Sequence, residues 1–252
     1  MNVLFALARR EFMQLIRSTH GLGPLFLALA GAGGLFIYFL HNAEGSAETL
    51  PALWGMAVAF GLPFLAASAA SRGFTQDRER GMMRLMFATP VRARWWVLGK
   101  VLAAWDLCLL YVGGMGLACW FWVRYLAPES ATIPTSWFGF CLAIVALAIQ
   151  AFLWCSMGTL VSLFARSSAS TFLASLLVSL FAPPFVCFAL SVVAPAAVST
   201  QLPWFPLQTL VYDCAGGVLD IRALVTCLTA SCVLIYAAGF TFDALRLCAT
   251  ER

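Results

Sequence analysis

The stretch WFGFCLAIVALAIQAFLWCSMGTLVSLFA, from Trp137 to Ala165, contains no charged side chain. A helix of about 20 residues spans the roughly 30 Å hydrocarbon layer of a membrane, and this stretch is longer than that. Its one amide, Gln150, and its few hydroxyl groups leave the stretch strongly apolar. It is therefore predicted to be a transmembrane helix, and this prediction sets the class of fold for the whole chain.

The composition of the chain agrees with a membrane protein. Hydrophobic residues make up 62% of the 252 residues, and charged residues make up 10%. Soluble domains carry about 25% charged residues, because water-facing surfaces need them. The apolar and polar alternation of a membrane barrel is missing from this sequence. We therefore expect an all-α polytopic membrane protein that forms a single transmembrane domain over residues 1–252.

Six stretches are predicted to span the membrane. They run from about Leu22 to Leu40, Ala52 to Ala70, Trp96 to Val123, Trp137 to Ala165, Thr171 to Ala194 and Ile221 to Leu245. Pro183 and Pro184 are expected to kink or break the fifth span, because proline removes backbone donors. Residues 199–220 are apolar only in part and contain Pro203 and Pro206, so we expect short helices that re-enter the outer leaflet.

Basic residues are distributed unevenly between the two sides of these spans. With a cytoplasmic N-terminus, every lysine and arginine except Arg124 and Arg222 falls on the cytoplasmic side. The outer loops instead hold acids, namely Glu44, Glu48, Glu129, Asp213 and Asp220. The positive-inside rule therefore predicts that the N-terminus and the C-terminus are both cytoplasmic.

Residues 1–20 are predicted to form a helix that lies along the inner membrane surface. One set of mainly apolar positions recurs at near-helical spacing, and a second set of basic residues is available to the lipid headgroups. The first set is Leu4, Leu7, Ala8, Glu11 and Leu15, and the second is Arg9, Arg10 and Arg17.

Residues 74–90, FTQDRERGMMRLMFATP, begin the main concentration of charge in the chain. Gly81 permits a bend, and Pro90 ends the helical run. The apolar residues of this segment have two possible uses; they are Met82, Met83, Leu85, Met86 and Phe87. They pack against the membrane domain of the same chain, or they form a docking knob for another protein, because methionine adapts to a partner groove. Both interpretations remain open from the residues alone.

Asp106 lies inside the third predicted span. An ionised carboxylate at the centre of a bilayer costs about 2.5–3.5 kcal/mol on insertion scales, so such a residue is a functional candidate by default. A role in the substrate path or in gating is one interpretation. A structural hydrogen-bonding role close to the membrane surface is the other.

The nine cysteines do not predict a metal site. Most of them fall inside apolar stretches, and no pair has C-x-x-C spacing. The two histidines, His20 and His41, flank the first span and do not complete a ligand set. We therefore expect no bound metal, and we interpret these cysteines as small hydrophobic residues.

The chain also lacks the pattern of an ATP-binding loop. That loop needs G-x-x-x-x-G-K-[ST], so that backbone amides and the lysine hold the phosphates. The only lysine, Lys100, is followed by Val101, and Arg94 stands at the position of the first glycine. An intramembrane enzyme, such as a protease or a lipid transferase, is an alternative, but HExxH is absent, and a paired-aspartate site is missing because Asp106 is the only deep acid. We therefore expect no enzyme activity, no catalytic residue and no cofactor in this chain.

Several motifs make the chain similar to the permease subunits of ABC-2-type transporters. These permeases carry an acidic, arginine-containing stretch, a glycine-led helical motif that ends in proline, and then L-G-K. The matching positions here are Asp77-Arg78-Glu79-Arg80-Gly81, Leu85, Pro90 and Leu98-Gly99-Lys100. The segment 8–18 resembles the N-terminal interfacial helix of the family. Residues 207–225 resemble the stretch before the last helix, especially in the gliding-motility-associated branch.

The resemblance implies an exporter half-transporter. Its six-helix permease would pair with a second permease copy or a paralogue and bind two P-loop ATPase subunits, which hold ATP and magnesium. Residues 74–90 would be the coupling helix that enters an ATPase groove. The implied coupling residues are Asp77, Arg78, Glu79, Arg80, Gly81, Arg84 and Leu85. Met82 and Arg84 depart from the threonine and glutamate usual in the family, and Arg84 reverses the charge.

The expected location is the bacterial inner (cytoplasmic) membrane, with the lipid bilayer as a partner and no nucleic acid. The spans contain no corridor of cations, so we expect a lipid-like or amphiphilic substrate. The alternative function is a non-transporting membrane transducer or anchor driven by the same type of ATPase.

Overall fold

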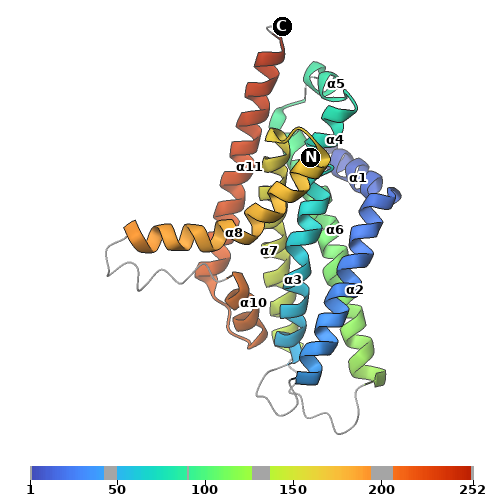
Figure 1. Ribbon diagram of the computed structural model, residues 1–252, viewed down its shortest axis with the longest axis vertical. Coiled ribbons are helices and arrows are strands. Elements are labelled where there is room, and N and C mark those ends of the chain that lie inside the picture. Colours follow the sequence, from blue (N-terminus) through green and yellow to red (C-terminus); the bar gives the residue numbers. More distant parts are fainter. Residues whose placement is uncertain (1, 43–49, 90, 127–136, 194–206, 251–252) are drawn as a thin grey trace.

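The computed structural model describes residues 2–42, 50–89, 91–126, 137–193 and 207–250, and all the regular elements within these ranges are helical. In chain order they are α1 Asn2–Arg17, α2 Thr19–Asn42, α3 Leu50–Ala70, α4 Phe74–Glu79, α5 Met83–Ala88, α6 Ala93–Phe121, η1 Trp122–Leu126, α7 Trp137–Phe164, α8 Ser168–Val193, α10 Leu207–Ala215 and α11 Ile221–Thr250 (Figure 1). The predicted all-α class is confirmed.

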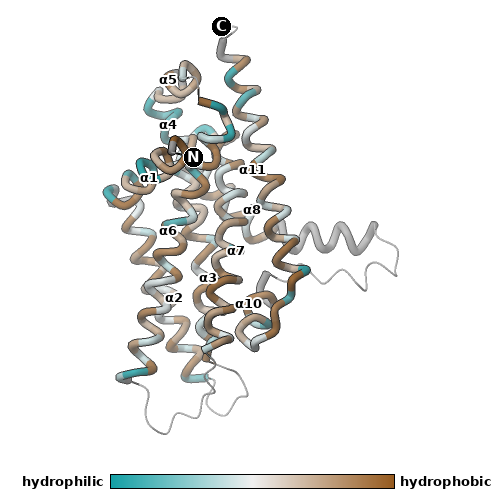
Figure 2. Tube along the Cα trace, turned by 180° about the vertical axis from the view of Figure 1, so that it is seen from behind, coloured by the Kyte–Doolittle hydropathy of each residue, from teal (hydrophilic) through white to brown (hydrophobic). Residues whose placement is uncertain are grey.

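Five helices in the described part of the chain are long and apolar enough to cross a membrane. These candidate spans run over Gly21–Asn42, Leu50–Glu79, Ala93–Tyr125, Trp137–Phe164 and Ile221–Cys248. Figure 2 shows hydrophobic residues along the middle of these helices and hydrophilic residues near α1 and α4. The multi-pass membrane architecture predicted from the sequence is therefore confirmed.

The fifth predicted span corresponds to α8, which begins at Ser168 and ends at Val193. This helix continues through Pro183 and Pro184, so the two prolines do not break it. Its apolar stretch with described side chains, Ser168–Phe181, is shorter than a full span. In Figure 1, α8 departs from the direction of the other long helices, and its far end projects sideways away from the bundle.

Helix α3 lies at the centre of the bundle, where it contacts α2, α6, α7, α8 and α10. Most of its side chains are buried, and the indole of Trp54 packs on the ring of Phe140 with their centroids 4.4 Å apart. The hydroxyl of Tyr111 on α6 donates a hydrogen bond to the carbonyl of Val58 at 3.1 Å. Lipid tails are as apolar as these side chains, so close packing and such hydrogen bonds hold the helices together.

Part of the predicted re-entrant segment 199–220 is helical. Residues 199–206 lie outside the described residues, and α10 follows them from Leu207 to Ala215. The helix packs against α7 and α3 and buries Leu210 and Val211 completely. A short turn then leads into α11, so the prediction of a short helix before the last span holds for residues 207–215.

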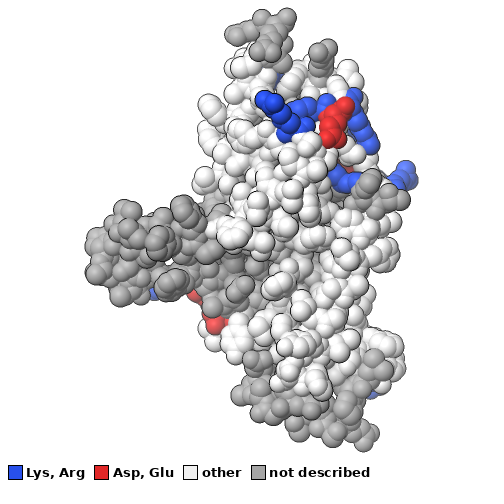
Figure 3. Space-filling view, in the orientation of Figure 1, with Lys and Arg blue, Asp and Glu red and all other residues white. Residues whose placement is uncertain are grey.

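Helices α1, α4 and α5 lie at the same end of the bundle, beside the C-terminal part of α11 (Figure 1). We call this end the charged end. Figure 3 shows lysine and arginine atoms gathered there around a smaller acidic patch, above a wide belt of uncharged atoms. The predicted N-terminal segment contains a helix, α1, Asn2–Arg17, and its position along the membrane surface stays a prediction.

Candidate functional site

The segment predicted to be one coupling helix, residues 74–90, forms two short helices. Helix α4 ends at Glu79, and α5 begins at Met83. Gly81 between them has a φ of +71°, a conformation that residues with a Cβ atom rarely adopt. The backbone at Thr89 is extended, as expected directly before proline. The chain therefore reverses at Gly81 and projects a compact turn from the charged end.

Aromatic and sulfur-containing side chains hold this turn against the bundle. Phe74 is fully buried, and its ring centroid lies 5.2 Å from that of Phe242 on α11. Phe87 approaches the same Phe242 ring with a centroid distance of 5.3 Å. Met83 and Met86 are only 7% and 6% exposed. These methionines therefore pack against the chain itself and do not face a partner.

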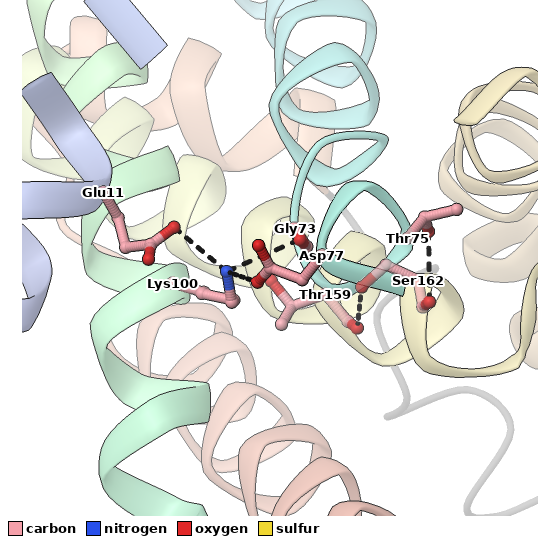
Figure 4. A network of polar contacts seen from close by, with 7 residues as sticks. All are labelled: Glu11, Gly73, Thr75, Asp77, Lys100, Thr159 and Ser162. Carbon is pink, nitrogen blue, oxygen red and sulfur yellow. Dashed lines mark hydrogen bonds and ion pairs between the residues drawn. The ribbon is translucent and has the colours of Figure 1, made fainter. Parts of the chain in front are cut away.

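Lys100 on α6 is the centre of a buried ionic cluster (Figure 4). Its Nζ lies 2.6 Å from Oδ2 of Asp77 on α4 and 3.0 Å from Oε2 of Glu11 on α1. The same ammonium group lies 3.4 Å from the Gly73 carbonyl and 5.2 Å from the centroid of the Phe74 ring. The Lys100 side chain is only 3% exposed, so water screens these contacts weakly. One cation thus joins α1, α4 and α6.

The close approach of α1 to α6 explains the glycine that precedes Lys100. A Cβ atom on Gly99 would lie 3.2 Å from Cβ of Leu7, which is tighter than usual packing. Leu7 and Glu11 are separated by one helical turn, so they share a face of α1. Gly99 therefore lets the backbone of α1 come close enough for Glu11 to reach Lys100.

Arg78 and Glu79 attach α4 to the connection between α7 and α8. The guanidinium of Arg78 donates to the carbonyls of Leu163 and Ala165, each at 2.6 Å, at the C-terminal end of α7. Glu79 accepts hydrogen bonds from the amide and hydroxyl of Ser168, at 2.9 and 3.0 Å, at the first residue of α8. A cation at a helix C-terminus and an anion at a helix N-terminus both stabilise the helix.

Thr75 adds a buried link to the same connection. Its hydroxyl lies 3.1 Å from the Ser162 carbonyl, to which it donates, and 2.7 Å from the hydroxyl of Thr171 on α8. All three residues are buried. Together with Asp77, Arg78 and Glu79, this threonine fixes α4 to α1, α6, α7 and α8.

The predicted coupling residues therefore divide into two groups. Asp77, Arg78 and Glu79 bind other helices of the same chain, whereas Arg80, Gly81 and Leu85 are exposed. Leu85 has 62% of its surface accessible. The backbone of Arg84 belongs to α5, but its side chain lies outside the described residues.

Asp106 lies on α6, farther from the charged end than Lys100. It follows Gly99 by two helical turns, about 10 Å along the axis, and so shares the face that meets α1. Asp106 is half-buried, and the exposed residues Leu110, Gly113 and Leu117 continue this face toward the far end. No hydrogen bond or ion pair of the Asp106 carboxylate is formed with the described residues.

The described residues contain no group of three or more histidine, cysteine or acidic side chains that could hold a metal ion. The Lys100 cluster itself has an ammonium group at its centre, which occupies the position a cation would take. The cluster therefore has a structural role, because it fixes helices relative to each other. It contains no nucleophile with an adjacent base.

Long apolar helices with a charged, helix-turn-helix segment at one end define a multi-pass membrane protein. The family model described as ABC-2 family transporter protein matches residues 5–211, and the chain belongs to this family. It is therefore a permease subunit of an ABC transporter. No curated protein matches the chain significantly. The closer resemblance to the gliding-motility-associated branch stays a prediction.

The sequence did not identify Glu11 and Phe242 as parts of this site, and it noted Lys100 only within a motif. One signal was available for Lys100, because a lone lysine in a strongly apolar chain requires a counter-charge when it is buried. Glu11 was the one acid of the N-terminal helix and was grouped with its apolar positions. Phe242 gave no signal, because it resembles every other aromatic residue in the last span.

Proposed function

We propose that this permease is an exporter subunit that couples ATP hydrolysis in a separate ATPase to movement of a lipid-like or amphiphilic substrate. The observation that carries the proposal is the Lys100 cluster, which fixes α4 to α6 and α1. A push on the exposed turn at Gly81 would reach three helices through contacts that are already formed. A coupling segment needs this rigidity, because a loose turn would absorb the movement.

The proposed orientation places the charged end in the cytoplasm of a bacterium, with both chain termini there and the chain in the inner membrane. Arg9, Arg10 and Arg17 support it, because all three are exposed on α1, where anionic headgroups would attract them. Arg124 and Arg222 are at the other end of the spans.

The proposed assembly has two permease subunits, identical or paralogous, on two P-loop ATPases. ATP and magnesium would bind the ATPase subunits, because the sequence around Lys100 lacks the glycine-rich loop that binds phosphates. Lys100 is in addition already engaged by Asp77 and Glu11. This chain would accordingly act without enzyme activity of its own.

Asp106 supports an amphiphilic substrate. Its half-buried side chain lies on the helix face that continues through the exposed Leu110, Gly113 and Leu117, and its carboxylate has no partner in the described residues. An intramembrane acid of this kind is costly and usually serves a pathway or a ligand. A substrate with a polar headgroup and an apolar chain would bind the carboxylate through the headgroup and the apolar face through the chain.

The alternative function is a membrane transducer or anchor that responds to the same ATPase without moving a substrate. The packing of α3 favours it, because Trp54, Leu62 and their neighbours fill the centre of the described bundle with apolar side chains. A transducer needs a rigid bundle, whereas a transporter needs a path between its subunits.

Reconstitution separates these functions. The permease is purified with its ATPase, placed in liposomes, and assayed for ATP turnover and for transfer of fluorescent phospholipid between leaflets. The proposed function predicts ATP-dependent transfer that is lost in Lys100→Ala. ATP turnover that depends on the permease but moves neither lipid nor added amphiphile would favour the transducer. Permease that purifies without any P-loop ATPase would refute both.

A further inference from the structure

We propose that the ATPase groove which receives residues 80–88, called here the α4–α5 tip, is acidic at its rim and apolar at its floor. The partner is the ATPase of the proposed function, on which this inference rests. The segment 77–80 reads as charge-balanced, with two acids and two arginines. The fold makes its outward surface basic.

The acids of the segment are already engaged. Asp77 is bound to the buried Lys100 at 2.6 Å. Glu79 is exposed, but its two oxygens accept from the amide and hydroxyl of Ser168. A carboxylate that already neutralises an ammonium group or a helix N-terminus has less to gain from a second cation. These acids are therefore poor contacts for a partner.

Several arginines at this end, unlike Arg78, have no such contact. Four arginines beside the tip in sequence or at the α7–α8 connection are exposed and make no side-chain hydrogen bond or ion pair with the described residues; they are Arg80, Arg92, Arg94 and Arg166. The exposed acids of the neighbouring surface are Glu79 and Asp243. Basic atoms accordingly surround one acidic patch at this end in Figure 3. Arg84 adds a further basic residue to α5 by sequence.

Leu85 supplies the apolar contact. It is 62% exposed on α5, whereas Met83 and Met86 on the same helix are buried. A single large apolar side chain among charges is the usual pattern of an interface anchor, which fills a pocket while charges at the rim select the partner. The fitting groove has a small apolar pocket for Leu85.

Carboxylates are the groups that fit the rim. Guanidinium groups pair with carboxylates through two parallel hydrogen bonds, and a basic rim opposite them would cost several kcal/mol. Anionic lipid headgroups offer similar chemistry, but Figure 1 shows α5 further from the middle of the bundle than α1. Since α1 is the helix with the interfacial pattern, the tip projects beyond the headgroups, and a protein groove is the better fit.

A photo-crosslink at the tip tests the proposal directly. Leu85 is replaced by benzoylphenylalanine in the full chain, cells are irradiated, and the crosslinked peptide is sequenced by mass spectrometry. We expect a peptide from a P-loop ATPase with aspartate or glutamate residues flanking the contact. An ATPase peptide without flanking acids overturns the acidic groove but leaves the proposed function standing. Crosslinks to lipid alone overturn both.

Charge reversal gives a second, independent test on the ATPase recovered in this way. Arg80→Glu with Arg92→Glu is expected to reduce ATPase co-purification at least about tenfold, equivalent to 1.4 kcal/mol or more. Arg124→Glu with Arg222→Glu makes the same change at exposed positions of the opposite end and should have no effect. The unmodified complex should weaken as salt rises. Binding that ignores both salt and charge reversal contradicts the proposal, whether or not the variants fold well.

Discussion

Lys100 on α6 holds the Asp77 carboxylate of α4 at 2.6 Å, deep at the charged end of the bundle. The same ammonium group reaches Glu11 of α1 at 3.0 Å, so the charged cluster is shared by three helices. Two carboxylates around one cation carry a net negative charge, which the Gly73 carbonyl does not offset. Removal of the cation is therefore far more disruptive than removal of either acid.

Lys100→Met is predicted to destabilise the permease by about 3–5 kcal/mol, because it leaves Asp77 and Glu11 partly buried without a counter-charge. Unfolding of the purified full chain in detergent measures the loss. Adding Asp77→Asn and Glu11→Gln to this variant should restore part of the stability, since neutral groups cost less to bury. Arg124→Met removes an exposed charge and serves as the control. Equal stability of Lys100→Met and the control would show that the cluster is not formed.

Gly99→Leu is predicted to displace α1 from α6. Even a Cβ atom at this position would lie 3.2 Å from Cβ of Leu7, and a leucine side chain needs more space than the contact provides. The expected result is a loss of about 1–3 kcal/mol in stability and faster protease cleavage of α1. A Cβ atom at Gly113 on the same helix would meet no atom within 4 Å, so Gly113→Leu should be tolerated. Equal tolerance of both variants would contradict the close approach of the two helices.

Arg78→Ala and Arg80→Ala are predicted to have different effects, although the two residues are close in sequence. Arg78→Ala frees the Leu163 and Ala165 carbonyls and should cost about 1–3 kcal/mol of stability. Arg80→Ala removes an exposed side chain and should change stability by less than about 0.5 kcal/mol, while it weakens ATPase binding. Measuring thermal stability and co-purified ATPase for both variants separates the roles. A stability loss in Arg80→Ala as large as that in Arg78→Ala would remove the distinction.

Asp106→Asn is predicted to leave folding intact and to reduce lipid transfer. The amide keeps the shape of the carboxylate and lowers the cost of placing it in lipid, so stability should be unchanged or higher. The liposome assay should show transfer lowered while ATP turnover continues. Asp243→Asn, an exposed acid at the charged end, provides the matched control. If Asp106→Asn transports at the normal rate, Asp106 has no part in the substrate path.

The predicted spans show what could be read without coordinates. Hydropathy is a property of each residue, and helical periodicity needs only neighbours in the sequence, so α2, α3, α6, α7 and α11 were found close to their observed bounds. Gly81 was noted as a position that permits a bend, because its conformational freedom is local, but residues 74–90 were predicted to be one helix and not two. The unbroken course of α8 through Pro183 was not predicted. A proline in the sequence shows only that one backbone N–H donor is missing, and it does not show whether the helix continues.

The sequence by itself determined that this chain is a membrane protein built of apolar helices, with its charge concentrated between the second and third predicted spans. Only the tertiary structure decided which charged side chains are paired inside the fold and which remain exposed. Lys100 and Glu11 are 89 residues apart, and the sequence around either residue does not predict that the two will pair. Their pairing follows from the way α1 packs on α6 at Gly99, and the same packing of helices turns Asp77 inward while Arg80 stays in water.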